Sequence, residues 1–241
     1  MLYRSYRLLV AAVLAGSVAG IIYALANLAF ISPLLHLAEG YEHAAHAHAH
    51  SEGGDDATII IRAGLTLGLS LSLYIAYGLL LAAAMHLAQS RRHTATHGNP
   101  TITATTGIVW GLAGFTACHL APAFVLSLSL PGLAHTHALP LASQQLWWWG
   151  IAGAVAAGLY LTAITRQASR VVGMVVAASA ILIPALILGN GQVGSALGNV
   201  ASDVAGDVPA QLGALFASRS LGAHALGWAV LGYALSRSYK P

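Results

Sequence analysis

The apolar stretch Leu8-Leu-Val-Ala-Ala-Val-Leu-Ala-Gly-Ser-Val-Ala-Gly-Ile-Ile-Tyr-Ala-Leu-Ala-Asn-Leu-Ala-Phe-Ile31 decides the fold class of this 241-residue chain. An apolar run of eighteen or more residues is long enough to cross a bilayer as a helix, and similar runs recur along the sequence. Only 7% of the residues are charged, against about 25% in a soluble domain. The mean hydropathy is +0.73. We therefore predict an all-α, polytopic integral membrane protein.

The remaining composition excludes several function classes. A single cysteine, Cys118, rules out an internal disulfide and a cysteine-based zinc site. The ten basic residues are dispersed, which does not favour a nucleic-acid partner. No glycine-rich phosphate loop and no His-Glu-x-x-His pattern is present. We therefore expect a protein that is not an enzyme, with the lipid bilayer as its main partner.

The spacing of the apolar runs predicts one membrane domain, residues 1–241, with about six transmembrane helices. We retain the first as a helix and do not interpret it as a signal peptide, because the apolar run continues past Ala26. The expected spans are 8–31, 59–87, 105–126, 146–165, 171–188 and 213–235.

Charge sorts the segments between these spans onto two sides. With six alternating helices, one side receives eight of the ten basic residues, namely Arg4, Arg7, Arg91, Arg92, Arg166, Arg170, Arg237 and Lys240. The positive-inside rule assigns that side, with both termini, to the cytoplasm. All seven acidic residues fall on the other side. We expect a multi-pass protein of a bacterial inner membrane, with the acidic side in the periplasm.

The segment 36–58 concentrates histidines and acids and is predicted to be a periplasmic loop. Neutral imidazole and carboxylate both bind divalent transition metals. Alternate residues of an extended segment share a face, so His135 and His137 in a later loop could also chelate together. A weak metal buffer or a disordered tract without function is the alternative for such runs. The candidate ligands outside the membrane are His36, Glu39, Glu42, His43, His46, His48, His50, His135 and His137.

Two histidines are predicted inside the membrane, where an ionisable group is costly and indicates function. His119 is placed roughly 21 Å from the cytoplasmic end of its span, and His224 near the midplane, so their depths are expected to differ by several ångströms. Pro122 cannot bond the carbonyl of Cys118 four residues earlier, which would leave an oxygen beside His119. A neutral ring bonded to a neighbouring helix is the structural alternative for each histidine.

Small residues and two arginines complete the expected packing. Gly16-x-x-x-Gly20, Gly107-x-x-x-Gly111-x-x-Gly114 and Gly150-x-x-Gly153 have the spacing that lets helix backbones approach closely. Trp147-Trp148-Trp149 has the character of an interfacial anchor. We expect Arg62 and Arg219 to pair at the outer face with Asp203, Asp207 or the carboxylates that follow the first span.

The succession of motifs resembles the CbtA family of predicted cobalt transporter subunits. The resemblance rests on the basic start of the chain and on segments that cover most of it in order: Pro33-Leu-Leu with Glu39 and Tyr41-Glu42, the histidine-rich run, Trp110-Gly-Leu-Ala-Gly-Phe115, His119-Leu-Ala-Pro122, Leu130-Pro-Gly132, Gln145-Leu-Trp147-Trp148, and Trp228 with Leu231-Gly232. The resemblance implies cobalt movement for cobalamin synthesis, together with a small single-span companion subunit that carries histidines. One departure is Ala185, where family members often have a histidine after the proline of the fifth span.

We therefore predict a transport protein or transporter subunit for a divalent transition metal. The loop would collect the ion, and His119 and His224 would serve as translocation ligands. Cobalt is implied by the resemblance alone, and nickel or zinc would suit the same ligands. Two alternatives stay open: a non-transporting scaffold or assembly subunit with a metal-buffering loop, and a haem-binding redox protein that uses His119 and His224 as axial ligands. The sequence does not decide whether the chain forms an oligomer.

Overall fold

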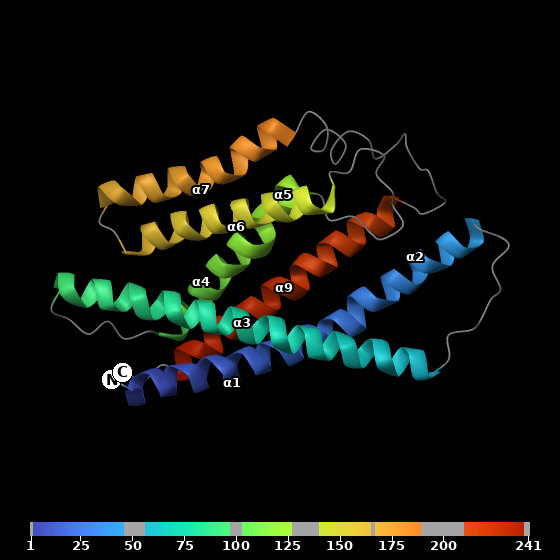
Figure 1. Ribbon diagram of the computed structural model, residues 1–241, viewed down its shortest axis with the longest axis horizontal. Coiled ribbons are helices and arrows are strands. Elements are labelled where there is room, and N and C mark those ends of the chain that lie inside the picture. Colours follow the sequence, from blue (N-terminus) through green and yellow to red (C-terminus); the bar gives the residue numbers. More distant parts are fainter. Residues whose placement is uncertain are drawn as a thin grey trace.

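Six helical rods make up the part of the chain that the computed structural model describes, residues 2–45, 56–96, 103–126, 140–164, 167–188 and 210–238 (Figure 1). Long apolar runs without interior charge favour helices in lipid, because a helix satisfies its backbone hydrogen bonds internally. The elements are α1 (Leu2–Ala26), η1 (Asn27–Ile31), α2 (Ser32–Ala45), α3 (Asp56–Thr96), α4 (Ala104–Phe115), η2 (Thr116–Leu120), α5 (Ala121–Val125), α6 (Leu141–Ile164), α7 (Gln167–Leu188) and α9 (Ala210–Ser238).

The predicted class, a helical polytopic membrane protein, is confirmed. Four helical stretches are long and apolar enough to cross a membrane: Tyr6–Tyr41, Ile59–Arg91, Ala104–Val125 and Ala142–Ile164. A shorter apolar helix covers Val171–Ala185. The other expected span coincides with α9, which is 29 residues long and carries Arg219 and His224. Six membrane crossings therefore remain a prediction.

The first two helical rods are longer than a bilayer is thick. Tyr6–Tyr41 has 36 residues, roughly 54 Å of helix at 1.5 Å per residue, whereas the hydrocarbon core measures about 30 Å. Helix α2 continues to Ala45, so the predicted loop does not include residues 36–45, which are helical. His36, Glu39, Glu42 and His43 thus lie on a helix that continues the first apolar rod.

Glycines bring three pairs of helices into backbone contact. A Cβ added to Gly16 of α1 would lie 2.6 Å from the Cα of Ile75 on α3. On the other pairs, a Cβ on Gly111 of α4 would collide with the Trp228 carbonyl of α9, and one on Gly158 of α6 would lie 2.7 Å from the Gly173 carbonyl of α7. The packing role predicted for Gly16, Gly20, Gly107, Gly111 and Gly114 is confirmed, whereas Gly150 and Gly153 have open space.

The surface of the described bundle is apolar, as lipid contact requires. Leu69, Leu146 and Trp149 are each about 70% exposed (70%, 73% and 69%). Trp149 packs edge-on against Trp148, with ring centroids 4.9 Å apart, near the start of α6. The buried polar side chains of the described helices are the small Ser70, Ser220 and Ser236. This inverted polarity fits a protein whose solvent is hydrocarbon.

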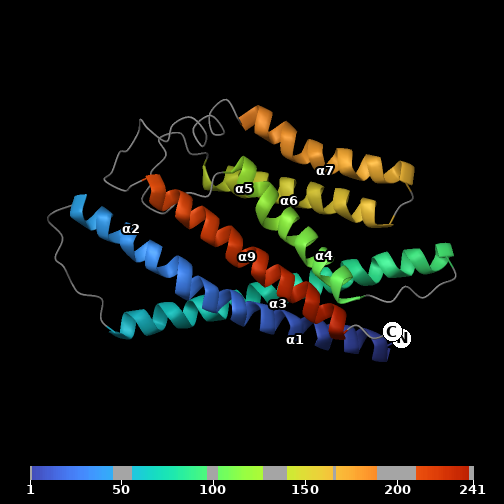
Figure 2. The same cartoon turned by 180° about the vertical axis from the view of Figure 1, so that it is seen from behind.

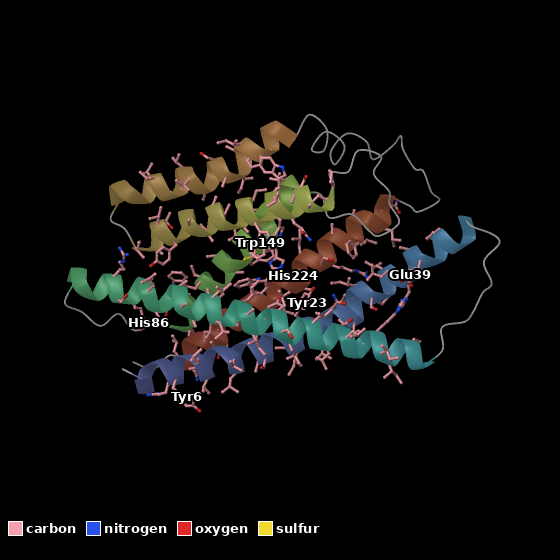
Figure 3. The ribbon with its side chains drawn as sticks, viewed as in Figure 1. Tyr6, Tyr23, Glu39, His86, Trp149 and His224 are labelled. Carbon is pink, nitrogen blue, oxygen red and sulfur yellow. The ribbon has the colours of Figure 1, made fainter. Side chains whose placement is uncertain are left out.

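The start of α1 and the end of α9 lie together at one end of the bundle, as Figure 1 and the reverse view in Figure 2 show. The helix ends that contain Arg7 and Arg237 are at that end. The end of α2 and the start of α3 lie toward the opposite end, on the side where Glu39 is found (Figure 3). Glu39 and the basic helix ends thus lie at opposite ends of the bundle, and the side of the membrane that each end faces stays a prediction.

We expect Gly16→Ala to destabilise the protein, because its Cβ would meet backbone atoms of α3 that cannot move aside alone. Overpacking of this kind costs about 1–3 kcal/mol. The matched control is Gly68→Ala on α3, where nothing lies within 4 Å and alanine favours the helix. Unfolding by SDS in mixed micelles would measure the difference, and equal midpoints for the two variants would contradict the close approach of α1 and α3.

Candidate functional site: a stacked histidine pair within the helix bundle

The centre of the bundle holds two histidines from helices that are far apart in sequence. The ring centroids of His119 and His224 are 3.8 Å apart, and the ring planes differ by 30°. Figure 3 shows His224 in the middle of the bundle beside Tyr23. Sequence reasoning selected both histidines but left open whether they face a common space. The structure brings them into face-to-face contact.

The expected difference in depth between the two histidines is wrong. His119 lies fifteen residues after Ala104, the first residue of α4, or roughly 22 Å along the helix axis. Helix α9 ends at Ser238, fourteen residues after His224, which is roughly 21 Å. The predicted sixth span ended three residues earlier, at 235, and those missing residues account for the apparent offset.

A π-helical segment carries His119 toward the bundle centre. In η2 the amide of Ala121 bonds the Thr116 carbonyl, five residues earlier. Pro122 follows directly and lacks the N–H that an α-helix would direct to the Cys118 carbonyl. The segment η1 has the same arrangement, with the Ser32 amide bonded to the Asn27 carbonyl and Pro33 following. Such widened turns occur often at functional sites.

The Trp228 side chain is hydrogen-bonded to the His119 ring. Its indole Nε1–H donates to Nδ1 of His119 over 3.2 Å. The two residues come from η2 and α9, and Trp228 is one helical turn after His224 on α9. The indole also stacks on Tyr77 of α3, with centroids 4.7 Å apart and planes 30° apart. The His119 ring is thereby tied to two other helices.

His224 is bonded through both ring nitrogens to tyrosines. The Tyr23 hydroxyl lies 3.1 Å from Nε2, and the Tyr74 hydroxyl lies 3.3 Å from Nδ1. Tyr74 also donates to the His224 carbonyl over 3.4 Å, and Asn27 donates to the Tyr23 hydroxyl over 3.5 Å. Buried polar groups need such partners, because leaving one unbonded is costly. The structural alternative predicted for each histidine, a ring bonded to a neighbouring helix, is therefore present.

Aromatic rings and Cys118 also lie around the histidine pair. Tyr77 meets His119 edge-on at 5.7 Å, and the Phe115 ring lies nearly parallel to His119 at 6.2 Å. Cys118 is partly buried against the same apolar cluster, in which Tyr74 and Trp228 are among the buried members. Its side chain packs, as expected for a lone membrane cysteine. Within the described residues, no three His, Cys, Asp or Glu side chains are grouped so that they could hold a metal ion.

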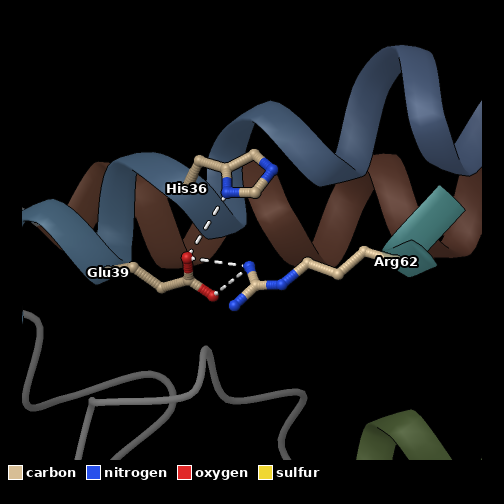
Figure 4. Close-up of polar contacts among 3 residues, drawn as sticks. All are labelled: His36, Glu39 and Arg62. Carbon is tan, nitrogen blue, oxygen red and sulfur yellow. Dashed lines mark hydrogen bonds and ion pairs between the residues drawn. The ribbon is translucent and has the colours of Figure 1, made fainter. Parts of the chain in front are cut away.

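A second polar group lies between α2 and α3, away from the histidine pair. Nδ1 of His36 is 3.3 Å from Oε2 of Glu39, and the Arg62 guanidinium is 3.2 Å from both Glu39 oxygens (Figure 4). The three side chains are about half exposed, at 50%, 44% and 56% for His36, Glu39 and Arg62. The prediction that Arg62 pairs with a carboxylate after the first span is confirmed.

Arg219 contacts a backbone carbonyl in the described part of the chain, and its predicted pairing with a carboxylate stays a prediction. Its guanidinium donates to the Phe30 carbonyl in η1 over 3.1 Å. The carboxylates of Asp203 and Asp207 lie outside the described residues, as do His46, His48, His50, His135 and His137. Glu42 and His43 belong to α2, but their side chains are not among those described. The collecting segment therefore stays a prediction.

Sequence reasoning missed the tyrosines and assigned Trp228 no role of its own. Tyr23, Tyr74 and Tyr77 come from apolar runs in which a tyrosine carries no obvious signal. Spacing offered one clue, because His224 and Trp228 are four residues apart and so share a face of α9. The glycines opposite that face, Gly111 and Gly114, were identified for packing alone.

We expect Tyr74→Phe to destabilise the protein by about 1–3 kcal/mol, because it strips Nδ1 of His224 of its buried partner. Tyr233→Phe on α9 is the matched control, at a residue that is 46% exposed, and should change stability by less than about 0.5 kcal/mol. SDS unfolding would report both. In the double variant with His224→Phe, the Tyr74 substitution should cost less than it does alone; additive costs would contradict the hydrogen bond.

Comparison with known proteins gives one family. The family described as "Probable cobalt transporter subunit (CbtA)" matches residues 5–240. Neither the curated proteins nor the solved structures gave a match. The matched region contains both histidines of the pair, the Trp228 that binds one of them, and the His36–Glu39–Arg62 group. Because the match spans nearly the whole chain, this protein belongs to the CbtA family of probable cobalt transporter subunits.

Proposed function

We propose that the chain moves a divalent transition metal, cobalt by its family, inward across a bacterial inner membrane. The observation that carries the proposal is the contact between His119 and His224, with centroids 3.8 Å apart, inside the bundle. Burying two imidazoles in a membrane domain is costly, and such residues mark ion pathways. A transporter subunit is not an enzyme, and the family supports that assignment.

The entry to the pathway is proposed at helix α2. The histidine-rich segment would collect the ion and pass it to His36 and Glu39, which are 3.3 Å apart and half exposed. Arg62 neutralises Glu39 in the described state. An exposed ion pair of this kind is worth only about 0–1 kcal/mol, so an arriving dication can replace the guanidinium. The positive-inside argument puts this end in the periplasm.

The centre of the pathway would use the histidines as successive ligands. A metal bonds an imidazole nitrogen in the plane of the ring. The rings of His119 and His224 face each other, so one ring must rotate before a single ion can be bound by both. The membrane potential supplies about 4.6 kcal/mol for a dication at 100 mV, twice the value for one charge, without a second driving ion.

The ligands support the class of metal, whereas the choice of cobalt and the presence of a companion subunit rest on the family. Nitrogen and oxygen ligands bind cobalt, nickel, copper and zinc, with affinity rising toward copper, so this ligand set supports the class of metal only. Cobalt comes from the family description, and so does the word subunit. We propose a small histidine-bearing membrane protein as the companion, and cobalamin synthesis as the process that consumes the ion.

The redox alternative gains no support from the geometry. Axial haem ligands approach the iron from opposite faces of the porphyrin, so their rings are separated by the macrocycle. The rings of His119 and His224 contact each other directly, and their nitrogens are bonded to Trp228, Tyr23 and Tyr74. The Soret absorbance of the purified protein would test this alternative, and a colourless preparation would end it.

We expect the double variant His119→Ala, His224→Ala to lose most cobalt accumulation in cells that express the full chain. The matched control is His86→Ala, at an exposed histidine of α3 outside the pair (Figure 3). Intracellular cobalt, measured by mass spectrometry after exposure to limiting metal, is the readout. Normal accumulation by the double variant, present at normal abundance, would remove the membrane-embedded part of the proposal.

Deletion of residues 43–50 separates a transporter with a collecting loop from a scaffold that buffers metal. A collecting role predicts reduced uptake when cobalt is scarce and normal uptake when it is abundant, because such ligands raise the local metal concentration without forming the pathway. The same cobalt measurement over a range of concentrations gives the answer. Unchanged uptake at the lowest concentration would show that the histidines of this segment are dispensable for transport.

A further inference from the structure

The hydrogen bond from Trp228 determines which nitrogen of His119 carries the proton. An indole N–H is a donor and never an acceptor. Since it donates to Nδ1 of His119, Nδ1 must offer its lone pair, and the neutral ring must hold its proton on Nε2. The described state therefore leaves His119 without a free lone pair. Nδ1 is engaged by the indole, and Nε2 is protonated.

The structure holds the indole in place from two sides. Trp228 is only 3% exposed and stacks on Tyr77 of α3. On the α4 side it covers Gly114, where an added Cβ would collide with the indole ring. Glycine at this position therefore permits the approach that brings Nε1 to His119. A donor fixed this firmly is a defined competitor for the imidazole lone pair.

We propose that Trp228 is a positioning residue that sets the affinity of the membrane-embedded metal site: its indole N–H occupies Nδ1 of His119 until a transition-metal ion displaces it. This inference rests on the proposed function and adds a control element to the same site. The exchange breaks one hydrogen bond and forms one metal–nitrogen bond. The protons stay on Nε2 of His119 and on Nε1 of Trp228, so no proton is released and no redox change is involved.

The competition favours one class of cation. Cobalt, nickel and zinc bind imidazole nitrogen well, whereas magnesium and calcium prefer oxygen ligands. A cation that gains little from nitrogen cannot repay the loss of the indole hydrogen bond. Trp228 would thus set an affinity threshold for every cation that needs Nδ1, and a transition metal exceeds that threshold through its stronger bond to nitrogen. The second ring, His224, is held by Tyr23 and Tyr74 and would be recruited after the first exchange.

The test replaces one atom of the indole. In the full chain, benzothienylalanine at position 228 keeps the size and stacking of the ring but has sulfur where the indole has N–H. The same replacement at Trp149, which is 69% exposed, is the matched control. Cobalt binding to the purified protein is followed by visible absorption, with the His119→Ala, His224→Ala variant as the baseline for the histidine-rich segment.

We expect the dissociation constant for cobalt at the pair to fall about two- to tenfold on replacement of Trp228, the range that corresponds to one net hydrogen bond. Replacement of Trp149 should leave it unchanged. Magnesium should compete no better against cobalt in the Trp228 variant than in the natural protein, because the indole hydrogen bond opposes equally every cation that must take Nδ1. Nitrogen NMR of histidine-labelled protein should show Nδ1 of His119 unprotonated in the natural chain.

Two outcomes would overturn the inference. One is an unchanged or weaker cobalt affinity in the Trp228 variant, and the other is a proton on Nδ1 of His119 in the natural protein. Either result would leave the proposed function intact, provided that the His119→Ala, His224→Ala variant still fails to accumulate cobalt. Normal accumulation by that double variant would instead defeat the proposed function, and the role of Trp228 with it.

Discussion

The close approach of α4 to α9 is the constraint on which the rest of the centre depends. A Cβ on Gly107 would collide with the Gly232 carbonyl, and one on Gly111 with the Trp228 carbonyl. In lipid, helices associate through packing and interhelical hydrogen bonds, with no gain from leaving water, so small residues set the distance. That distance puts the His119 ring against the His224 ring and places the Trp228 indole within 3.2 Å of Nδ1. Larger residues at these glycines would separate the two helices that carry the pair.

The polar atoms of the centre are bonded to one another, because a buried polar atom without a partner is costly. Each imidazole nitrogen with a described partner is bonded to an aromatic side chain, either Trp228, Tyr23 or Tyr74. Aromatic residues suit this position because a large apolar ring carries one polar atom. The π-helical turns in α1–α2 and α4–α5 lie next to this centre, each just before a proline. A π-helical turn followed by a proline thus occurs in both helical rods, α1–α2 and α4–α5, that pack against α9.

Much of the architecture followed from the residues in order. The apolar runs predicted each helical rod, and the glycines at 16, 20, 107, 111 and 114 predicted the contacts. His119 and His224 were recognised because an ionisable group in an apolar run is conspicuous. Their contact was not predictable, since it depends on the ends and tilts of α4 and α9. The helical state of residues 36–45 was also missed, because the apolar run ends near Ile31, whereas the helix continues through the π-helical turn and Pro33 into α2.

By itself, the sequence determined the membrane class, the helix order and the likeness to cobalt transporter subunits, because hydropathy and charge are local properties that need no neighbours. It also identified the histidines and acids that suit a transition metal. Only the tertiary structure decided which of them meet. Backbone contact at glycines stacks His119 on His224. Glu39 pairs with Arg62, which lies 23 residues later in the sequence, and the indole of Trp228 donates to Nδ1 of His119. Such pairings arise from helix separation and rotation, which no single segment encodes.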